Sequence, residues 1–214
     1  MIRVLLVDDQ QLVRAGLRML CESAGDITVV GEVGNGLEAV RHAERLHPDV
    51  ILMDLRMPVM DGTTATERIL RARPTTRIVV LTTFDDDEHL YPALLAGACG
   101  FLVKDTAPAN LLDAVRRAAA GESAFSPGVL GRLVDRAVTA RSDTAPSADL
   151  SGITEREREV LALVGEGLSN GEIAERLSLG VTTVKTHVAN LMTKTDTSNR
   201  VRLAVLAARN GLAT

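Results

Sequence analysis

The stretch Val50-Ile-Leu-Met-Asp54 is a short apolar run that ends on a carboxylate, and it sets the pattern that decides the fold. Similar runs recur through the first 120 residues, at Ile2–Val7, Ile27–Val33, Ile78–Leu81 and Gly100–Val103. They are rich in β-branched residues or Leu and do not alternate with polar residues, which is typical of strands buried on both faces. The pattern predicts five buried strands, of which 50–53 is the third.

Amphipathic segments with helical spacing separate these runs. Their apolar faces comprise Leu12, Val13, Leu17 and Leu20 in the first segment, Ala39, Val40, Ala43 and Leu46 in the second, Thr66, Ile69 and Leu70 in the third, Leu90, Leu94 and Leu95 in the fourth, and Leu111, Leu112, Val115 and Ala119 in the fifth. Five strand–helix units predict an α/β domain with a doubly wound, five-stranded parallel sheet. The functional edge of such a sheet lies at the carboxyl ends of its strands.

Three carboxylates stand at these strand ends. Asp8 and Asp9 follow the first strand, and Asp54 closes the third. Because the first and third strands are neighbours in a doubly wound sheet, the three groups should converge. Converging carboxylates repel one another unless a divalent cation lies among them, and oxygen ligands favour Mg²⁺. A carboxylate beside Mg²⁺ can attack a phosphoryl donor, so the cluster predicts a site that forms an aspartyl phosphate.

Two further strand ends offer phosphate ligands, the hydroxyl of Thr82 and the ammonium group of Lys104. Each residue of the cluster also fits a structural role by itself. Paired aspartates often cap a helix, a lone lysine is usually a solvated surface residue, and a threonine can simply belong to a strand. Their joint presence at four strand ends favours the phosphoacceptor interpretation. The acidic run Asp85–Glu88 is interpreted instead as the start of the fourth helix.

The composition changes after residue 121. Residues 129–138 predict one short helix. Residues 140–149 are small and polar and contain a proline, which is typical of a flexible linker. We therefore divide the chain into a first domain at 1–121, a linker at 122–148 and a second domain at 149–214.

The second domain is predicted to be all-α. Thr154 with Glu157, and Ser169 with Glu172, have the spacing of capping boxes ahead of apolar runs. The tripeptide Ser178-Leu-Gly180 predicts a tight turn between two helices, which is the helix-turn-helix pattern. The helix after this turn, at about 181–193, has its core face at Val184, Val188 and Leu191.

A helix-turn-helix places its second helix in the major groove of DNA. The outward side chains of that helix are expected to be Thr182, Lys185, Thr186, Ala189 and Asn190. Lys185 can donate to guanine or phosphate, Thr186 can contact a thymine methyl, and Asn190 can bond to adenine or the backbone. Lys194 and Arg200 would suit phosphates. The alternative is an ordinary helical hairpin with a solvated polar face.

The distribution of charge favours the DNA-binding interpretation, although the whole chain has a net charge of −4. Residues 149–180 contain three Arg against seven Asp or Glu, whereas residues 181–214 contain five Lys or Arg against Asp196 alone. A locally cationic segment within an acidic protein suits a phosphate-facing surface. Aromatic residues make up only 2% of the chain, which argues against a stacking surface for single-stranded nucleic acid.

The strand-end motifs resemble the receiver domain of two-component response regulators over about residues 1–120. The matching motifs are Val7-Asp8-Asp9, Met53-Asp54-Leu55-Arg56-Met57-Pro58-x-x-Asp61-Gly62, Leu81-Thr82-Thr83 and Gly100-Phe101-Leu102-Val103-Lys104-Asp105. The resemblance implies a flavodoxin-like fold with Asp54 as the phosphoacceptor.

The same resemblance implies roles for the neighbouring residues. Asp9 and Asp54, with the backbone carbonyl of Arg56, would ligate Mg²⁺, and Asp8 would assist through water. Thr82 and Phe101 match the switch pair of the family, in which the hydroxyl moves toward the phosphate and the aromatic ring rotates inward. Lys104 lies in the last of the matching motifs.

The second domain is similar to the LuxR-type helix-turn-helix of the NarL/FixJ regulators over about residues 149–214. The matching residues are Thr154-Glu-Arg-Glu157-Arg-Glu-Val160-Leu161, Gly167-Leu-Ser-Asn170, Glu172-Ile173-Ala174, Leu177, Thr183-Val184-Lys185-Thr186-His187-Val188 and Asn190-Leu191. The resemblance implies that the last helix mediates dimerisation. It places Lys185, Thr186 and Ala189 on the base-reading face, and Asn170, Thr182 and Thr183 near the phosphate backbone.

Two residues depart from the pattern of the family. Thr195 replaces the usual Leu after Lys194, and Asp196 follows where Gly or another small residue is common. Both departures are expected to loosen the packing of the recognition helix on the last helix.

Together the resemblances imply a response regulator transcription factor of the NarL/FixJ family. A sensor histidine kinase would phosphorylate Asp54, and phosphorylation would control dimerisation and promoter binding, with RNA polymerase as a further partner. Such a protein is not an enzyme, because it only catalyses phosphoryl transfer to its own aspartate and hydrolysis from it. The N-terminus does not resemble a signal peptide, no stretch suits a membrane span, and Cys21 and Cys99 suit buried thiols. We therefore expect a cytoplasmic protein.

Two alternatives remain open at this point. A phosphatase or other Mg²⁺ hydrolase of the doubly wound type could use the same nucleophile, with the tail as a protein-interaction module. It would usually have an acidic residue two positions after the nucleophile, where Arg56 stands. A regulator that is independent of phosphorylation could use the same tail, although the complete cluster argues against it.

Overall fold

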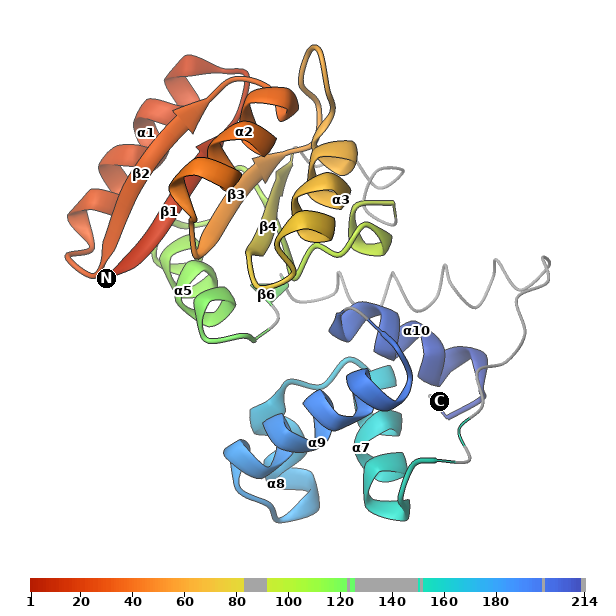
Figure 1. Ribbon diagram of the computed structural model, residues 1–214. Coiled ribbons are helices and arrows are strands. Elements are labelled where there is room, and N and C mark those ends of the chain that lie inside the picture. Colours follow the sequence, from red (N-terminus) through yellow and green to blue (C-terminus); the bar gives the residue numbers. More distant parts are fainter. Residues whose placement is uncertain (83–91, 123, 126–149, 151, 198, 213–214) are drawn as a thin grey trace. The chain divides into compact units, whose positions relative to one another are not determined.

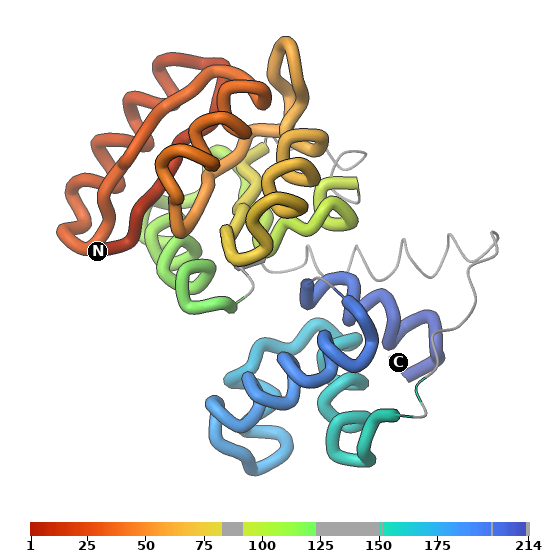
Figure 2. The backbone as a smooth tube through the Cα atoms, in the orientation of Figure 1, coloured from red at the N-terminus to blue at the C-terminus, as the bar shows by residue number. Residues whose placement is uncertain are grey.

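The computed structural model describes residues 1–82, 92–122, 124–125, 150, 152–197 and 199–212 (Figure 1). The chain divides into two units, Met1–Ser126 and Pro127–Thr214. Figure 2 traces the backbone through both units. The helix expected at 129–138, the run Asp85–Glu88 and most of the expected linker lie outside the described residues.

The first unit contains a parallel sheet with the strand order β2-β1-β3-β4-β5-β6. Its main strands are β1 (Ile2–Val7), β2 (Ile27–Val33), β3 (Val50–Asp54), β4 (Arg77–Thr82) and β5 (Gly100–Val103). The five parallel strands expected from the sequence are therefore confirmed. A two-residue strand, β6 (Ala124–Phe125), adds a sixth at the edge. It lies in the segment assigned to the linker, because so short a strand leaves no apolar run to recognise.

Helices cover both faces of the sheet (Figure 1). They are α1 (Gln11–Ser23), α2 (Gly36–Leu46), α3 (Gly62–Ala72) and α5 (Pro108–Ala119), and residues 92–95 are also helical. Alternate side chains of β1 enter two separate cores. Val4 and Leu6 pack with residues of α1 and α5, whereas Leu5 and Val7 pack with residues of α2 and α3. This two-sided burial is the reason why the strands lack polar alternation.

The expected buried face of α1 is wrong at one position. Leu17 and Leu20 pack against the core, but Leu12 is 86% exposed. Residues three or four positions apart share one face of a helix, so Val13, Leu17 and Leu20 form the inward stripe. Leu12 stands one residue earlier than Val13 and is therefore rotated away from it.

The second unit contains four described helices. They are α7 (Glu155–Gly165), α8 (Asn170–Leu177), α9 (Val181–Lys194) and α10 (Arg200–Arg209). Both expected capping boxes are present, at Thr154 with Glu157 and at Ser169 with Glu172. Ser178, in the left-handed conformation with φ +52°, ends α8, and Gly180 is the N-cap of α9. The turn expected from the sequence is therefore confirmed, and α9 begins without a side-chain cap at Gly180.

Candidate functional site

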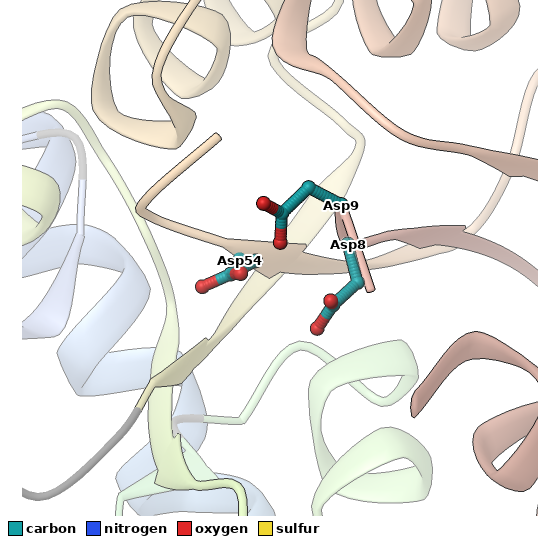
Figure 3. Close-up of side chains that lie close together, drawn as sticks. All are labelled: Asp8, Asp9 and Asp54. Carbon is teal, nitrogen blue, oxygen red and sulfur yellow. The ribbon is translucent and has the colours of Figure 1, made fainter. Parts of the chain in front are cut away.

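Asp8, Asp9 and Asp54 meet at the carboxyl ends of β1 and β3 (Figure 3). The two strands are neighbours, and Val7 is aligned with Met53, so the residues that follow lie side by side. Each aspartate offers a carboxylate oxygen, and these oxygens all lie within 4.8 Å of one another. Asp8 and Asp54 are buried, with 1% and 4% exposure, whereas Asp9 is exposed. The structure therefore brings the three side chains together.

Lys104, the residue after β5, places its ammonium nitrogen against two of these carboxylates. Its Nζ lies 2.7 Å from Asp8 Oδ2 and 2.8 Å from Asp54 Oδ2. Burial raises the pKa of Asp54 and the charge of Asp8 adds to this effect, while the bond from Lys104 opposes it. Burial also disfavours the charged form of Lys104, but its bonds to both carboxylates outweigh burial and raise the pKa of the ammonium group.

The residues of this cluster fit a divalent cation. One ammonium group faces three carboxylates, so negative charge remains uncompensated among the groups that meet here. Asp8 Oδ2 is buried and lies 2.7 Å from the ammonium nitrogen of Lys104, which also contacts Asp54. Carboxylate oxygens are hard ligands of the type that Mg²⁺ prefers, so Asp8, Asp9 and Asp54 could hold this ion.

The loop after β3 shapes the entrance to the cluster. An open groove of about 680 Å³ is lined by Asp9, Leu55, Arg56, Met57, Asp61, Thr63, Thr64 and Pro92. The backbone N–H of Arg56 hydrogen-bonds to the Asp54 carboxylate, and the Arg56 side chain is exposed. The groove therefore opens onto Asp9, the exposed member of the acidic cluster.

The pair Asp61-Gly62 has a structural role that sequence reasoning missed. Asp61 caps α3 by accepting a bond from the backbone N–H of Thr64 at 2.8 Å. The Gly62 N–H donates to the Leu55 carbonyl at 2.9 Å, which folds the loop back onto the end of β3. A Cβ atom at Gly62 would lie 2.0 Å from the carbonyl oxygen of Asp54, so only glycine fits here. The pair thus fixes the backbone that carries the acidic cluster.

Thr82 and Phe101 lie on the two strands beyond β3. Thr82 ends β4 and is buried at 1% exposure, and its carbonyl accepts a bond from the Lys104 N–H at 2.7 Å. Phe101 lies in β5, aligned with Val80, and is buried at 4% exposure. Asp8, Asp9, Asp54, Thr82 and Lys104 therefore lie at the ends of β1, β3, β4 and β5, and Phe101 lies within β5.

In the second unit, α8, the turn and α9 form the expected helix-turn-helix. Val184, Val188 and Leu191 of α9 are buried, as expected from their spacing. Residues on the opposite side of α9 are exposed: Thr182, Thr183, Thr186, Ala189 and Asn190. Lys185 is half-buried at the flank of this face.

Lys194, expected to contact phosphate, is bound within its own domain. Its Nζ lies 2.7 Å from Oε2 of Glu157, a residue of α7 with 4% exposure. The same oxygen accepts bonds from the backbone N–H of Thr154 at 2.8 Å and from its hydroxyl at 3.0 Å. Lys194 and these Thr154 groups hold the pKa of Glu157 below its usual value. One carboxylate thus joins the start of α7 to the end of α9.

Arg200, expected to contact phosphate, is buried at 8% exposure. Its guanidinium donates to Asn170 Oδ1 at 2.7 Å and also to the carbonyl of Leu168. These bonds join the start of α10 to the start of α8. Asn170, expected near the phosphate backbone, therefore uses its side-chain oxygen inside the domain.

The two departures from the family pattern lie between α9 and α10. Thr195 hydrogen-bonds through Oγ1 to the Leu191 carbonyl at 2.7 Å and contacts Thr197 Oγ1 at 3.1 Å. Asp196 has φ +50°, in the left-handed region, where glycine is free of the strain that a Cβ atom introduces. The conformation explains why a small residue suits this position.

Comparison with known proteins gives both units a family. Residues 4–116 match the family of response regulator receiver domains, and residues 151–207 match the bacterial regulatory proteins of the luxR family. The chain is 45% identical over 212 residues to the transcriptional regulatory protein LiaR of Bacillus subtilis, with 99% of each chain covered. The chain belongs to the LuxR family of response regulators. It is also 40% identical to the response regulator protein VraR of Staphylococcus aureus, covering 99% of this chain and 98% of that protein.

Solved structures of response regulators share this architecture. The response regulator ChrA of a heme-sensing two-component system matches with a TM-score of 0.54 and 34% identity, covering 99% of this chain and 98% of that one. RcsB of Salmonella typhimurium matches with a TM-score of 0.57 and 27% identity, covering 95% and 96%. This LuxR-family regulator is thus a transcription factor of two-component systems, with a receiver and a LuxR-type DNA-binding domain. None of the helices in the described part of the chain has the length and hydropathy of a membrane-spanning segment.

Proposed function

We propose that a sensor histidine kinase phosphorylates Asp54 and that this modification controls dimerisation and the binding of promoter DNA. The observation that carries the proposal is the cluster of three aspartates whose oxygens lie within 4.8 Å of one another, with Lys104 bonded to two of them. In this transfer, a carboxylate oxygen of Asp54 forms a bond to phosphorus while the bond between phosphorus and the donor's nitrogen breaks.

Each residue around Asp54 has a task in this proposal. Asp9 and Asp54, with the backbone carbonyl of Arg56, would ligate Mg²⁺, and Asp8 would bind it through water. The ion, when bound, neutralises charge on the phosphoryl oxygens. Lys104, which already contacts Asp54, would exchange that carboxylate for a phosphoryl oxygen.

The hydroxyl of Thr82 and the ring of Phe101 would carry the signal away from the site. Both side chains are buried on neighbouring strands, Thr82 at the end of β4 and Phe101 within β5. A bond from the Thr82 hydroxyl to the phosphoryl group would favour one of two pre-existing arrangements of the surrounding surface. The position of Phe101 would change with it.

The second domain would read promoter DNA through α9. Lys185, Thr186 and Ala189 would face base edges, with Asn190 beside them, while Thr182, Thr183 and Asn170 would lie near phosphates. Two copies, paired through α10, would place two α9 helices on half-sites about one helical turn apart. RNA polymerase would then be a partner on the promoter, and a cytoplasmic location would follow from that role. We keep 1–121, 122–148 and 149–214 as the proposed domain limits.

Labelling with acetyl phosphate in the presence of Mg²⁺ tests the first half of the proposal. The wild type should be labelled on Asp54, and Asp54→Asn should not be labelled. Removal of divalent ions with a chelator should also prevent labelling. Labelling of Asp54→Asn as strong as that of the wild type would show that the acceptor is another residue.

Selection of DNA fragments with and without the phosphoryl donor tests the second half. The phosphorylated protein should enrich a two-fold symmetric sequence more strongly than the unphosphorylated protein or Asp54→Asn. Lys185→Ala should weaken binding and reduce its dependence on salt. Equal enrichment with and without the donor would favour the alternative of a regulator that is independent of phosphorylation.

A further inference from the structure

Each polar group of Asp8 has a partner that fixes its orientation. The backbone N–H donates to the Val33 carbonyl at 3.2 Å, and the carboxylate Oδ1 accepts a bond from the Gln10 N–H at 2.8 Å. The carboxylate Oδ2 is in the ion pair described above. The backbone carbonyl accepts a bond from Nη1 of Arg14, in the first turn of α1. Since this carbonyl belongs to the peptide that joins Asp8 to Asp9, the guanidinium holds the backbone between two of the clustered aspartates.

Arg14 is held in turn by Glu32 of β2. Its Nε lies 3.9 Å from Glu32 Oε2, and its side chain is only 18% exposed. The other carboxylate oxygen of Glu32 accepts a bond from Arg18, one turn further along α1. The donors of a guanidinium have a fixed planar arrangement, so a carboxylate on one side orients the donor on the other. Glu32 therefore orients Arg14 toward the carbonyl of Asp8.

A β-bulge in β2 turns Glu32 toward α1. Val29 is aligned with Val4 of β1, but Gly31 is aligned with the next residue of β1, so β2 contains one extra residue between them. The strand changes face at this point, because Val29 packs in the core beside α1 and α5, whereas Val33 packs in the core beside α2 and α3. Neighbouring residues of a strand point to opposite faces, so Glu32 lies on the α1 side. Bulges beside functional sites re-aim side chains in this way.

We propose that Arg14 is a positioning residue for the acidic cluster, because it fixes the peptide between Asp8 and Asp9 and so holds their carboxylates in the arrangement that binds Mg²⁺. Glu32 contributes by orienting the guanidinium. This inference rests on the proposed function, which requires Mg²⁺ at the cluster. Asp9 is the exposed aspartate of the three, so its orientation depends on the backbone that leads into it.

Removal of the guanidinium has two effects on metal binding, and they act in opposite directions. Arg14 is a cation close to the acidic cluster, so by charge alone its loss would strengthen the binding of another cation. Its loss as a positioning residue would weaken that binding. Arg14→Met keeps the apolar stem of the side chain and removes the donor. We expect its dissociation constant for Mg²⁺ to rise about tenfold, as for other groups that orient metal ligands without contacting the metal.

Metal binding is measured on the full-length protein without phosphorylation. Mn²⁺ accepts the same oxygen ligands as Mg²⁺, so the EPR signal of free Mn²⁺ gives its dissociation constant, and displacement by Mg²⁺ gives that of Mg²⁺. Arg14→Lys keeps a charged donor and should recover part of the affinity that Arg14→Met loses. Arg18→Met is the matched control, because Arg18 lies on the same helix but bonds to Glu32 and Glu22 rather than to the Asp8 carbonyl. It should leave the dissociation constant within about twofold of the wild type.

A second measurement follows the chemistry of the site. The Mg²⁺ concentration that gives half-maximal labelling by acetyl phosphate should rise in Arg14→Met by the same factor as the dissociation constant. Unfolding in the presence of a chelator shows whether the variant is folded. If it is not, Arg14→Gln, which is also shorter than arginine, gives the same comparison.

Three outcomes would overturn the proposal. They are metal binding by Arg14→Met as tight as in the wild type or tighter, an equal loss of affinity in Arg18→Met, and a lower stability of Arg14→Met in chelator with an unchanged dissociation constant. The last would show that Arg14 only stabilises the fold. In all three cases the wild type would still bind Mg²⁺, so the proposed function would stand. Failure of the wild type to bind either ion would instead contradict the proposed function.

Discussion

Glu157→Gln should destabilise the DNA-binding domain by about 2 kcal/mol. The wild-type carboxylate is buried and accepts bonds from Lys194 at 2.7 Å and from the backbone of Thr154 at 2.8 Å. A hydrogen bond between charged groups contributes about 1.5–3 kcal/mol. The lower end of this range applies here, because the Lys194 side chain is 37% exposed and water can replace Glu157 as its partner. Weakening of the capping box adds a few tenths to about 1 kcal/mol.

The assay is thermal unfolding of the full-length protein followed by calorimetry. A loss of about 2 kcal/mol in a domain of this size corresponds to a fall of about 10 °C in the Tm of its transition. The difference in Tm between the wild type and Glu157→Gln should depend on pH. The folded-state pKa of Glu157 lies below its unfolded value, so the carboxylate stabilises the fold above the unfolded pKa of about 4.3. This stabilisation is lost as the pH falls through the folded pKa. The Tm values of the wild type and the variant should then converge.

Lys194→Gln tests whether Lys194 is held by Glu157 within the domain or contacts DNA directly. If Glu157 holds the Lys194 ammonium, the variant should weaken DNA binding without changing its salt dependence. A direct phosphate contact would lower the slope of log K against log[salt] by about 0.9.

The reasoning is refuted if Glu157→Gln leaves the Tm within about 2 °C of the wild type, or if the difference in Tm persists unchanged in acid.

Three further substitutions test other parts of the structure. Asp196→Gly should stabilise the second domain by about 0.5–1 kcal/mol, because it removes a Cβ atom at φ +50°, and chemical denaturation would measure this gain. Gly62→Ala should destabilise the receiver by about 1–3 kcal/mol and reduce acetyl phosphate labelling, since the added Cβ would meet the Asp54 carbonyl; full labelling would contradict this. Arg200→Ala should cost about 3 kcal/mol by leaving Asn170 without its partner, and an unchanged Tm would show that the buried guanidinium is dispensable.

The sheet and its acidic cluster could be predicted because their causes are local. A strand buried on both faces must be apolar at every position, so the inner strands such as β3 and β4 stand out as uninterrupted runs. The cluster follows from topology, because the first and third strands of a doubly wound sheet are neighbours and both end at the same edge. Asp8, Asp9 and Asp54 therefore converge without any knowledge of side-chain packing.

Features that depend on packing could not be predicted in this way. Leu12 is as apolar as Leu17, and only the rotation of α1 against the sheet decides that Leu12 is exposed. The two-residue strand β6 takes its conformation from its pairing with β5 and leaves no pattern of its own. The need for glycine at position 62 comes from the carbonyl of Asp54, eight residues earlier in the chain, which no local pattern reveals.

The cationic character of the C-terminal segment illustrates why a count of charges differs from a binding surface. Residues 181–214 contain five Lys or Arg, yet Lys194 binds Glu157 and Arg200 lies buried against Asn170. These two cations stabilise the helices that carry the recognition surface, so the charge excess overstates what the segment can offer to phosphates.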